Sequence, residues 1–183
     1  NVSLQFVVDT INPVVIISSP VNGFNTSANI PVIFNVVESN FFNATLIFGS
    51  TLISLNQSGS LTLIVPEGIN QSFSILANDQ LNHSNISTVF FNVDRTPPRV
   101  VVPANISVSI FDGRGALVLF NASNVSDNFV IDNLTWDFDS RDGIGSDASG
   151  VVVSKNYTIP ATFIVTLIAS DPAGNQNLSV IKV

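Results

Sequence analysis

The residues with the clearest chemical capacity are asparagines placed two positions before a serine or a threonine. Such Asn-X-Ser/Thr sequences, in which X is not proline, are acceptors for N-linked glycans. They include thirteen of the twenty-two asparagines, whereas random placement would give about four. The acceptor positions are Asn1, Asn25, Asn43, Asn56, Asn70, Asn82, Asn85, Asn105, Asn121, Asn124, Asn133, Asn156 and Asn177. The pattern predicts a secreted chain with covalent N-glycans; the alternative is that Asn and Ser merely gather in turns.

Aspartates gather in the second half of the chain, where oxygen-rich loops could bind Ca²⁺. Seven of the thirteen acidic residues lie between positions 127 and 171: Asp127, Asp132, Asp137, Asp139, Asp142, Asp147 and Asp171. Ca²⁺ takes roughly six to eight oxygen ligands, but the spacing matches no EF-hand loop. Asp also favours turns, because its side chain hydrogen-bonds the nearby backbone. Nothing marks a cleft with paired carboxylates for glycoside hydrolysis. We expect no resident cofactor or metal, with a Ca²⁺ site as the alternative.

The chain offers little for catalysis. His83 is the only histidine and lies in an expected turn with no partner nearby, so a serine triad or a histidine-ligated metal is not supported. Cysteine is absent, which excludes disulfides and thiol chemistry. Lys155 and Lys182 would permit a Lys–Asn isopeptide bond in the second half only, where ordinary surface lysines are the simpler interpretation. We therefore expect a protein that is not an enzyme.

The charge pattern argues against a nucleic-acid-binding protein. Charged residues make up 10% of the chain, the formal net charge is −7, and the first Lys or Arg is Arg95. Phosphate binding needs clustered cations. No apolar run approaches the ~20 residues of a transmembrane segment. Methionine is absent even at position 1, which favours a cleaved signal peptide. With dense acceptor sites and no cysteine, this predicts an archaeal-type extracellular glycoprotein of the cell surface.

Apolar and polar residues alternate at period two throughout, and no segment has a convincing helical period. Residues 30–37 are the clearest case, because Ile30, Val32, Phe34 and Val36 would share one face. The expected strands of the first module are 14–18, 30–37, 44–48, 52–55, 61–65, 72–77 and 86–93. Seven short strands separated by turn signals predict an immunoglobulin-like (Ig-like) β-sandwich over residues 9–93.

The beginning of this module resembles bacterial and archaeal Ig-like repeats. The resemblance rests on Asp9-Thr10-Ile11-Asn12-Pro13-Val14-Val15-Ile16, followed by Pro20 and Gly23. It covers most of residues 9–93 and implies the same sandwich fold.

Residues 94–183 predict a second sandwich, whose first residues, Asp94–Pro98, form a stiff linker that contains Pro97-Pro98. Its expected first strand is 100–110, either one long strand or a split one, and the others are 116–120, 134–138, 151–154, 163–169 and 178–183. The runs that start at Trp136, at Tyr157 and at Asp171 are similar to the PKD family of Ig-like domains. Two usual glycines of that family are Asp139 and Ala161 here. The fold predicts Trp136 in the core between the sheets, and the Tyr157 hydroxyl at a sheet corner.

The first eight residues have their own strand pattern, with Val2, Leu4, Phe6 and Val8 on one face. The sequence Val-Asp-x-Thr at residues 93–96 follows the closing strand of the preceding module, and Val-Asp-Thr at residues 8–10 resembles it. By analogy, residues 2–8 would complete a sheet that belongs to another molecule. The alternatives are a first strand of the module itself, or a remnant of a longer multidomain chain.

These observations predict an all-β chain of two tandem Ig-like β-sandwiches, 9–93 and 94–183, preceded by an N-terminal donor strand, 1–8. The architecture resembles archaeal thread filaments, which are glycosylated pili built by donor-strand complementation. That resemblance implies a head-to-tail homopolymer at the cell surface, with a role in adhesion and biofilm formation and with contacts to other cells or surfaces. Either module could receive the donor strand. The alternative is a surface adhesin, an S-layer protein or a glycan-binding accessory module.

Overall fold

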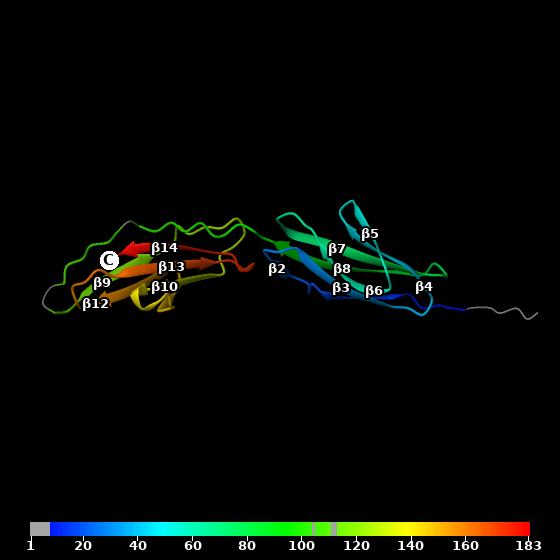
Figure 1. Cartoon of the computed structure of the whole chain (residues 1–183), viewed down its shortest axis with the longest axis horizontal. Coiled ribbons are helices and arrows are strands. Elements are labelled where there is room, and N and C mark those ends of the chain that lie inside the picture. The colour runs from blue at the N-terminus through cyan, green and yellow to red at the C-terminus, as the bar shows by residue number, and fades with distance from the viewer. Residues whose placement is uncertain (1–7, 104, 111–112) are drawn as a thin grey trace, which may run out of the picture. The chain divides into compact units, whose positions relative to one another are not determined.

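The computed structural model describes residues 8–103, 105–110 and 113–183, which form β-strands and no α-helix (Figure 1). The chain divides into two compact units, Asn1–Val93 and Asp94–Val183. The single helical element described is a 3₁₀ turn, η1 (Ser140–Asp142). The expected all-β class is confirmed.

Two sheets make up the first unit. One sheet has the order β1 (Val14–Ser19), β3 (Ile30–Val37) and β6 (Ser58–Leu63). The other has the order β2 (Phe24–Thr26), β8 (Ser84–Val93), β7 (Gly68–Asp79), β4 (Phe41–Phe48) and β5 (Thr51–Leu55). The pairs are antiparallel except for β2, which runs parallel to β8 and has no counterpart among the expected strands.

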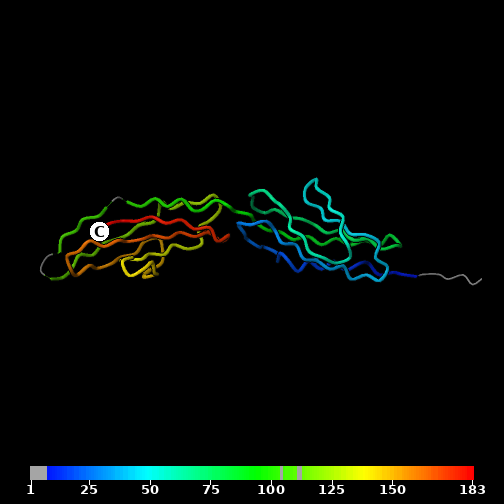
Figure 2. Tube along the Cα trace, viewed as in Figure 1, coloured from blue at the N-terminus to red at the C-terminus, as the bar shows by residue number. Residues whose placement is uncertain are grey.

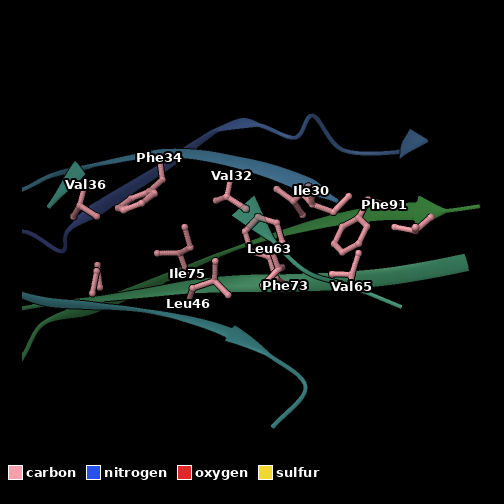
Figure 3. Packing of buried hydrophobic residues seen from close by; sticks show 14 residues of the cluster. Ile30, Val32, Phe34, Val36, Leu46, Leu63, Val65, Phe73, Ile75 and Phe91 are labelled. Atoms are coloured by element: carbon pink, nitrogen blue, oxygen red, sulfur yellow. The ribbon is translucent and has the colours of Figure 1, made fainter. Parts of the chain in front are cut away.

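Alternation along β3 creates the core of this unit. Ile30, Val32, Phe34 and Val36 are buried, while the residues between them are exposed. Figure 3 shows these side chains facing those of the opposite sheet, where Leu46, Phe73, Ile75 and Phe91 complete the cluster. Because side chains alternate across a strand, the period-two pattern fixes which face of β3 is buried.

The second unit also has two sheets. The larger has the order β11 (Ala148–Ser149), β10 (Asn133–Asp137), β13 (Ile164–Ser170) and β14 (Gln176–Lys182). The smaller pairs β12 (Val152–Tyr157) with β9 (Ala116–Asn121). Strand β11 has no counterpart among the expected strands.

Trp136 and Tyr157 lie where the sequence predicted them. Trp136 is fully buried, packs on Phe120 with ring centroids 5.4 Å apart, and donates its indole N–H to the carbonyl of Gly150 over 3.0 Å. The Tyr157 hydroxyl donates to the carbonyl of Phe138 over 3.2 Å, and burial raises the pKa of this hydroxyl to about 12. Both aromatic side chains therefore serve the core.

The expected strand over residues 100–110 is wrong for the residues described there. Arg99, just before the segment, forms an isolated bridge with Ser126, and within it the Ile106 N–H donates a hydrogen bond to the carbonyl of Lys182. No described residue of 100–110 belongs to a strand. In Figure 2 the green trace of this segment runs beside the red trace of β14. Pro98 and Pro103 lack the backbone N–H that a continuous ladder requires, which accounts for the interrupted pairing.

Candidate functional site

Three carboxylates of the second unit come together at the ends of its strands. Asp94 follows β8, Asp127 lies between β9 and β10, and Asp171 directly follows β13. Each offers a carboxylate oxygen, and the three oxygens lie within 4.8 Å of one another. Asp94 and Asp171 are each 3% exposed. We call these three residues the second acidic cluster.

Nearby N–H groups donate hydrogen bonds to only some of the carboxylate oxygens in this cluster. For each aspartate, the backbone N–H two residues further along donates to Oδ1 over 2.8–3.0 Å. Asn175 donates its Nδ2 to Asp171 Oδ2 over 2.8 Å and to the backbone carbonyl of Asp94 over 2.9 Å. The Oδ2 atoms of Asp94 and Asp127 are buried without a hydrogen-bond partner.

The pKa of Asp94 reflects its missing hydrogen-bond partner. Burial raises the pKa of the Asp94 carboxyl above its ordinary value, and the charges of Asp127 and Asp171 raise it further. Hydrogen bonds from Thr96 and Asn128 lower this pKa without cancelling the increase. Asp94 is therefore a buried carboxylate whose negative charge is poorly compensated.

A similar cluster lies in the first unit and consists of Asp9, Glu38 and Asp79. Here too each carboxylate accepts a hydrogen bond from the backbone N–H two residues further along, over 2.7–3.0 Å. Unlike in the second cluster, Asp9 Oδ2 accepts from Asn40 over 2.8 Å, and Asp79 Oδ2 lies 2.6 Å from His83 Nδ1. We call these three residues the first acidic cluster.

The sequence-based expectation that His83 has no partner is therefore wrong. Burial alone would raise the pKa of Asp79, but hydrogen bonds from the His83 N–H, the His83 ring and the Leu81 N–H outweigh it and lower this pKa. The side chain of His83 contacts the buried carboxylate of Asp79.

The two clusters occupy equivalent places in the two units. His83 in the first unit and Asn175 in the second stand four residues after the aspartate that they contact, Asp79 and Asp171. Just beyond, an asparagine at the start of the closing strand reaches back to a proline carbonyl over 2.9 Å. Asn85 donates to Pro13 in the first unit, and Asn177 donates to Pro98 in the second.

Sequence analysis identified Asp127 and Asp171 as candidates but placed Asp94 in a linker, and it passed over the whole first cluster. One signal was available in the sequence. In both units an aspartate stands four residues before the anchored proline, as Asp9 before Pro13 and as Asp94 before Pro98.

The other aspartates singled out in the sequence lie outside both clusters: Asp132, Asp137, Asp139, Asp142 and Asp147. Asp137 is buried and accepts hydrogen bonds from the N–H groups of Asp139 and Gly145. Asp139 forms a two-bond ion pair with Arg141 at 2.6 Å, and the hydrogen bond from Arg141 is the main cause of its lowered pKa. These contacts are the local turn chemistry that the sequence favoured.

The acceptor asparagines lie at the surface. Every one that the structure describes is exposed, from Asn25 to Asn177, and Asn1 lies outside the described residues. Several nevertheless use their amides locally: Asn85 and Asn177 bond proline carbonyls, and Asn133 donates to Thr135 over 3.1 Å.

Of the four donor-strand residues, Val2, Leu4 and Phe6 lie outside the described residues. Val8 is described and is 85% exposed. Among the described residues of the first unit, the first strand is β1, which begins six residues after Val8 at Val14 and pairs with β3.

Within the described part of the chain, the smaller sheet of the second unit has an unpaired edge along β9, which we call the free edge of β9. In the first unit, β3 has β6 on one side and β1 on the other. In the second unit, β9 pairs with β12, and no strand of the described residues pairs along its other side. Val118 and Phe120 of β9 still point into the core, so this edge borders a buried interior.

A groove of about 410 Å³ opens near the start of β9. The lining residues include Ile106, Ile110, Tyr157, Ile159 and Phe163, and none of them belongs to β9. Tyr157 is the last residue of β12 and pairs with Ala116, the first residue of β9, so the groove lies at that end of the smaller sheet.

Solved structures with similar backbones identify the fold. The fibronectin(III)-like modules of Clostridium thermocellum CbhA match with 19% identity and a TM-score of 0.55, over 92% of each chain. An I-band fragment of titin matches with 14% identity and a TM-score of 0.59, over 94% of this chain and 65% of the fragment. The three N-terminal domains of the highly immunogenic outer capsid protein of bacteriophage RB49 match with 10% identity and a TM-score of 0.59, over 94% and 67%.

The chain has an Ig-like, all-β fold. The expected all-β, Ig-like fold is thereby confirmed, and at these identities the likeness extends to the fold alone. Comparison with protein-family models finds no match, and comparison with curated protein sequences finds none either. Among the described residues, no helix has the length and apolar character needed to cross a membrane.

Proposed function

We propose that the chain is a structural subunit of an extracellular, N-glycosylated filament, in which residues 1–8 of one copy complete the second unit of another. The observation that carries this proposal is the free edge of β9. The first unit supplies its own strand, β1, beside β3, whereas the second unit has no described strand in the equivalent place. A strand that arrives from another copy would supply the missing backbone partners.

The side chains of the tail suit that place. A strand beside β9 would direct Val2, Leu4, Phe6 and Val8 into the core next to Val118 and Phe120. Each such side chain contributes on the order of 1.5–3 kcal/mol when buried, before the cost of ordering the tail. The sum is sufficient for a lasting non-covalent joint between subunits.

Polymerisation follows from the geometry of such a joint. The donated tail and the accepting edge are different surfaces, so each copy can donate to one neighbour and accept from the next. A contact of this heterologous kind propagates into a filament unless the ring closes. It also covers a sheet edge that would otherwise pair with other chains without control.

N-glycans would suit the exposed surface of the chain. Charge is sparse, at 10% of residues, and many large apolar side chains are exposed, including Leu117 at 71% and Leu119 at 65%. N-glycans on the exposed acceptor asparagines would keep this surface soluble. We propose a filament that serves adhesion and biofilm formation rather than catalysis, since neither acidic cluster includes a nucleophile with its base.

Single substitutions in the tail test this function. Phe6→Asp places a charge on the proposed buried face and should abolish filaments, whereas Gln5→Asp, on the opposite face, should leave them intact. Negative-stain electron microscopy and size-exclusion chromatography give the readout.

Deletion of residues 1–8 should leave a folded monomer with its tryptophan fluorescence unchanged. Filaments that survive the deletion, or that respond equally to both substitutions, would refute the proposal.

The second candidate is a surface-binding module such as an adhesin, S-layer or glycan-binding accessory domain. The observation that favours it is the outer face of the smaller sheet of the second unit, where Leu117, Leu119 and Val152 are all exposed. Under this alternative, binding of the chain to cells or glycans survives deletion of residues 1–8, and no filament forms from the intact chain.

A further inference from the structure

The second acidic cluster combines three negative charges in a small, largely buried volume. Its carboxylates come from three separate connections, at Asp94, Asp127 and Asp171, and one oxygen of each lies within 4.8 Å of the others. Two oxygens that bind one Ca²⁺ at about 2.4 Å each can be no more than about 4.8 Å apart. The spacing of the cluster therefore satisfies the geometric requirement for a shared ion.

Two oxygens in the cluster lack any partner. Asp94 is 3% exposed, and its Oδ2 is buried and accepts no hydrogen bond; Asp127 Oδ2 is in the same condition. Buried polar atoms in native proteins are nearly always hydrogen-bonded, so an orphaned carboxylate oxygen calls for a specific explanation. Two such oxygens within one acidic cluster point to a cationic ligand.

The surrounding contacts hold the cluster in place before any ion binds. Asn175 bridges the carbonyl of Asp94 and the carboxylate of Asp171 through its Nδ2. Arg99 and Ser126 exchange two backbone hydrogen bonds of 2.7 and 3.1 Å, which fix the connection that carries Asp127. These hydrogen bonds fix the backbone around the cluster and leave the unpartnered oxygens available.

The first acidic cluster shows the opposite arrangement and serves as an internal comparison. Asp9 and Asp79 have donors or a ring nitrogen at both oxygens, and His83 contacts Asp79. No atom of this cluster is among the buried, unpartnered ones. In the first unit, both oxygens of Asp9 and of Asp79 therefore have partners. At the equivalent position of the second unit, one oxygen of Asp94 and one of Asp127 have none.

We propose that Asp94, Asp127 and Asp171 bind one Ca²⁺ ion in the second unit. Ca²⁺ suits the site better than Mg²⁺, because it accepts irregular oxygen sets and longer bonds, whereas Mg²⁺ requires near-octahedral geometry at about 2.1 Å. Water and nearby carbonyl oxygens would complete the coordination. The ion would tie the first residue of the unit to two of its connections and raise the stability of that unit.

Calcium titration of the whole chain tests the proposal. After treatment with a chelator, isothermal titration with CaCl₂ should show one ion per chain, with a Kd of about 0.1–1 mM, the range of extracellular calcium modules. Thermal unfolding followed by the fluorescence of Trp136, the only tryptophan, should shift to higher temperature as CaCl₂ is added. MgCl₂ should bind at least about tenfold more weakly.

Matched variants decide which cluster is responsible. Asp94→Asn and Asp127→Asn should each abolish both the binding heat and the thermal shift, while Asp9→Asn in the first cluster should preserve both. Because either variant of the second cluster relieves the repulsion among three carboxylates, we expect each to fold, with the tryptophan emission of the parent chain. Should Asp94→Asn fail to fold, the half-buried Asp127→Asn decides. No response up to about 10 mM CaCl₂, an undiminished response in Asp127→Asn, or equal binding of MgCl₂ would overturn the proposal.

Discussion

Two asparagines show how single side chains secure the beginning of each unit. Asn85 and Asn177 stand at the start of the closing strands and donate to the carbonyls of Pro13 and Pro98. Each also accepts the N–H of the next residue, over 2.8 and 2.9 Å. Proline has no backbone N–H to donate to a neighbouring strand. The asparagines bind these segments through the proline carbonyl instead.

We predict that Asn177→Ala destabilises the second unit by about 1–2 kcal/mol, because two hydrogen bonds are lost and the Pro98 carbonyl is left without its partner. Urea denaturation of unglycosylated protein, followed by Trp136 fluorescence, measures the effect. The control is Asn124→Ala, an exposed acceptor asparagine, which should change stability by less than about 0.5 kcal/mol. Equal effects of the two variants would contradict this role for Asn177.

A second residue-scale prediction concerns acid. The folded-state pKa of Asp79 is lowered, so the ionised carboxylate stabilises the first unit above the unfolded-state pKa of about 3.9. That stabilisation disappears as the pH falls through the folded-state pKa. In urea titrations followed by far-UV circular dichroism, wild type should exceed Asp79→Asn in stability at pH 5 to 7, and the difference should shrink below about pH 4.

Asp132→Asn, at an exposed aspartate of the second unit, is the control that removes one carboxylate from the surface. A difference between wild type and Asp79→Asn that stays constant with pH would show that the ionised carboxylate contributes nothing.

At the scale of elements, the period-two alternation of apolar and polar residues largely decided which strands could be predicted from the sequence. Residues 30–37 were identified with the bounds that β3 has, because four apolar side chains at period two leave one possible buried face. The prediction for residues 100–110 was wrong because the valines and isoleucines there have strand character, whereas Pro103 within the segment and Pro98 just before it interrupt the pairing. Short β2 and β11 carry no pattern of their own and depend on the neighbour with which they pair.

The acidic clusters were harder to predict for a different physical reason. Their members are distant in sequence and meet because connections at one end of a sandwich converge. Spacing along the chain places Asp171 and Asn175 in one turn, but only the fold brings Asp94 and Asp127 to them. Local turn chemistry was therefore predictable, whereas the convergence of three carboxylates was not.

Strand β9 gives the element-scale prediction. Phe120→Ala should destabilise the second unit by about 3–5 kcal/mol, because its ring packs on Trp136 and Phe138 in the core. Leu119→Ala, at the exposed neighbouring position, should cost less than about 0.5 kcal/mol. Urea denaturation followed by Trp136 fluorescence separates them, and a costly Leu119→Ala would mean that the outer face of β9 is covered in solution.

At the scale of the whole molecule, the positions of the tryptophan and the tyrosine allow the unfolding of the two units to be followed separately. The chain has one tryptophan and one tyrosine, Trp136 and Tyr157, and both belong to the second unit. Fluorescence therefore reports the unfolding of the second unit, while circular dichroism reports both units. An experiment that adds the missing strand from outside can use this difference to locate the acceptor.

We predict that a synthetic peptide of residues 1–8 binds the chain from which those residues have been deleted, and that it raises the fluorescence-detected unfolding midpoint. At a peptide concentration of 100 Kd, the stabilisation amounts to about 2.7 kcal/mol, which corresponds to a shift of several degrees. A peptide with Leu4 and Phe6 replaced by aspartate should have no effect, because the charges would enter the core beside Val118 and Phe120. A shift confined to the transition seen only by circular dichroism would instead assign the tail to the first unit, where β1 already occupies the edge of β3, and would refute the role proposed for β9.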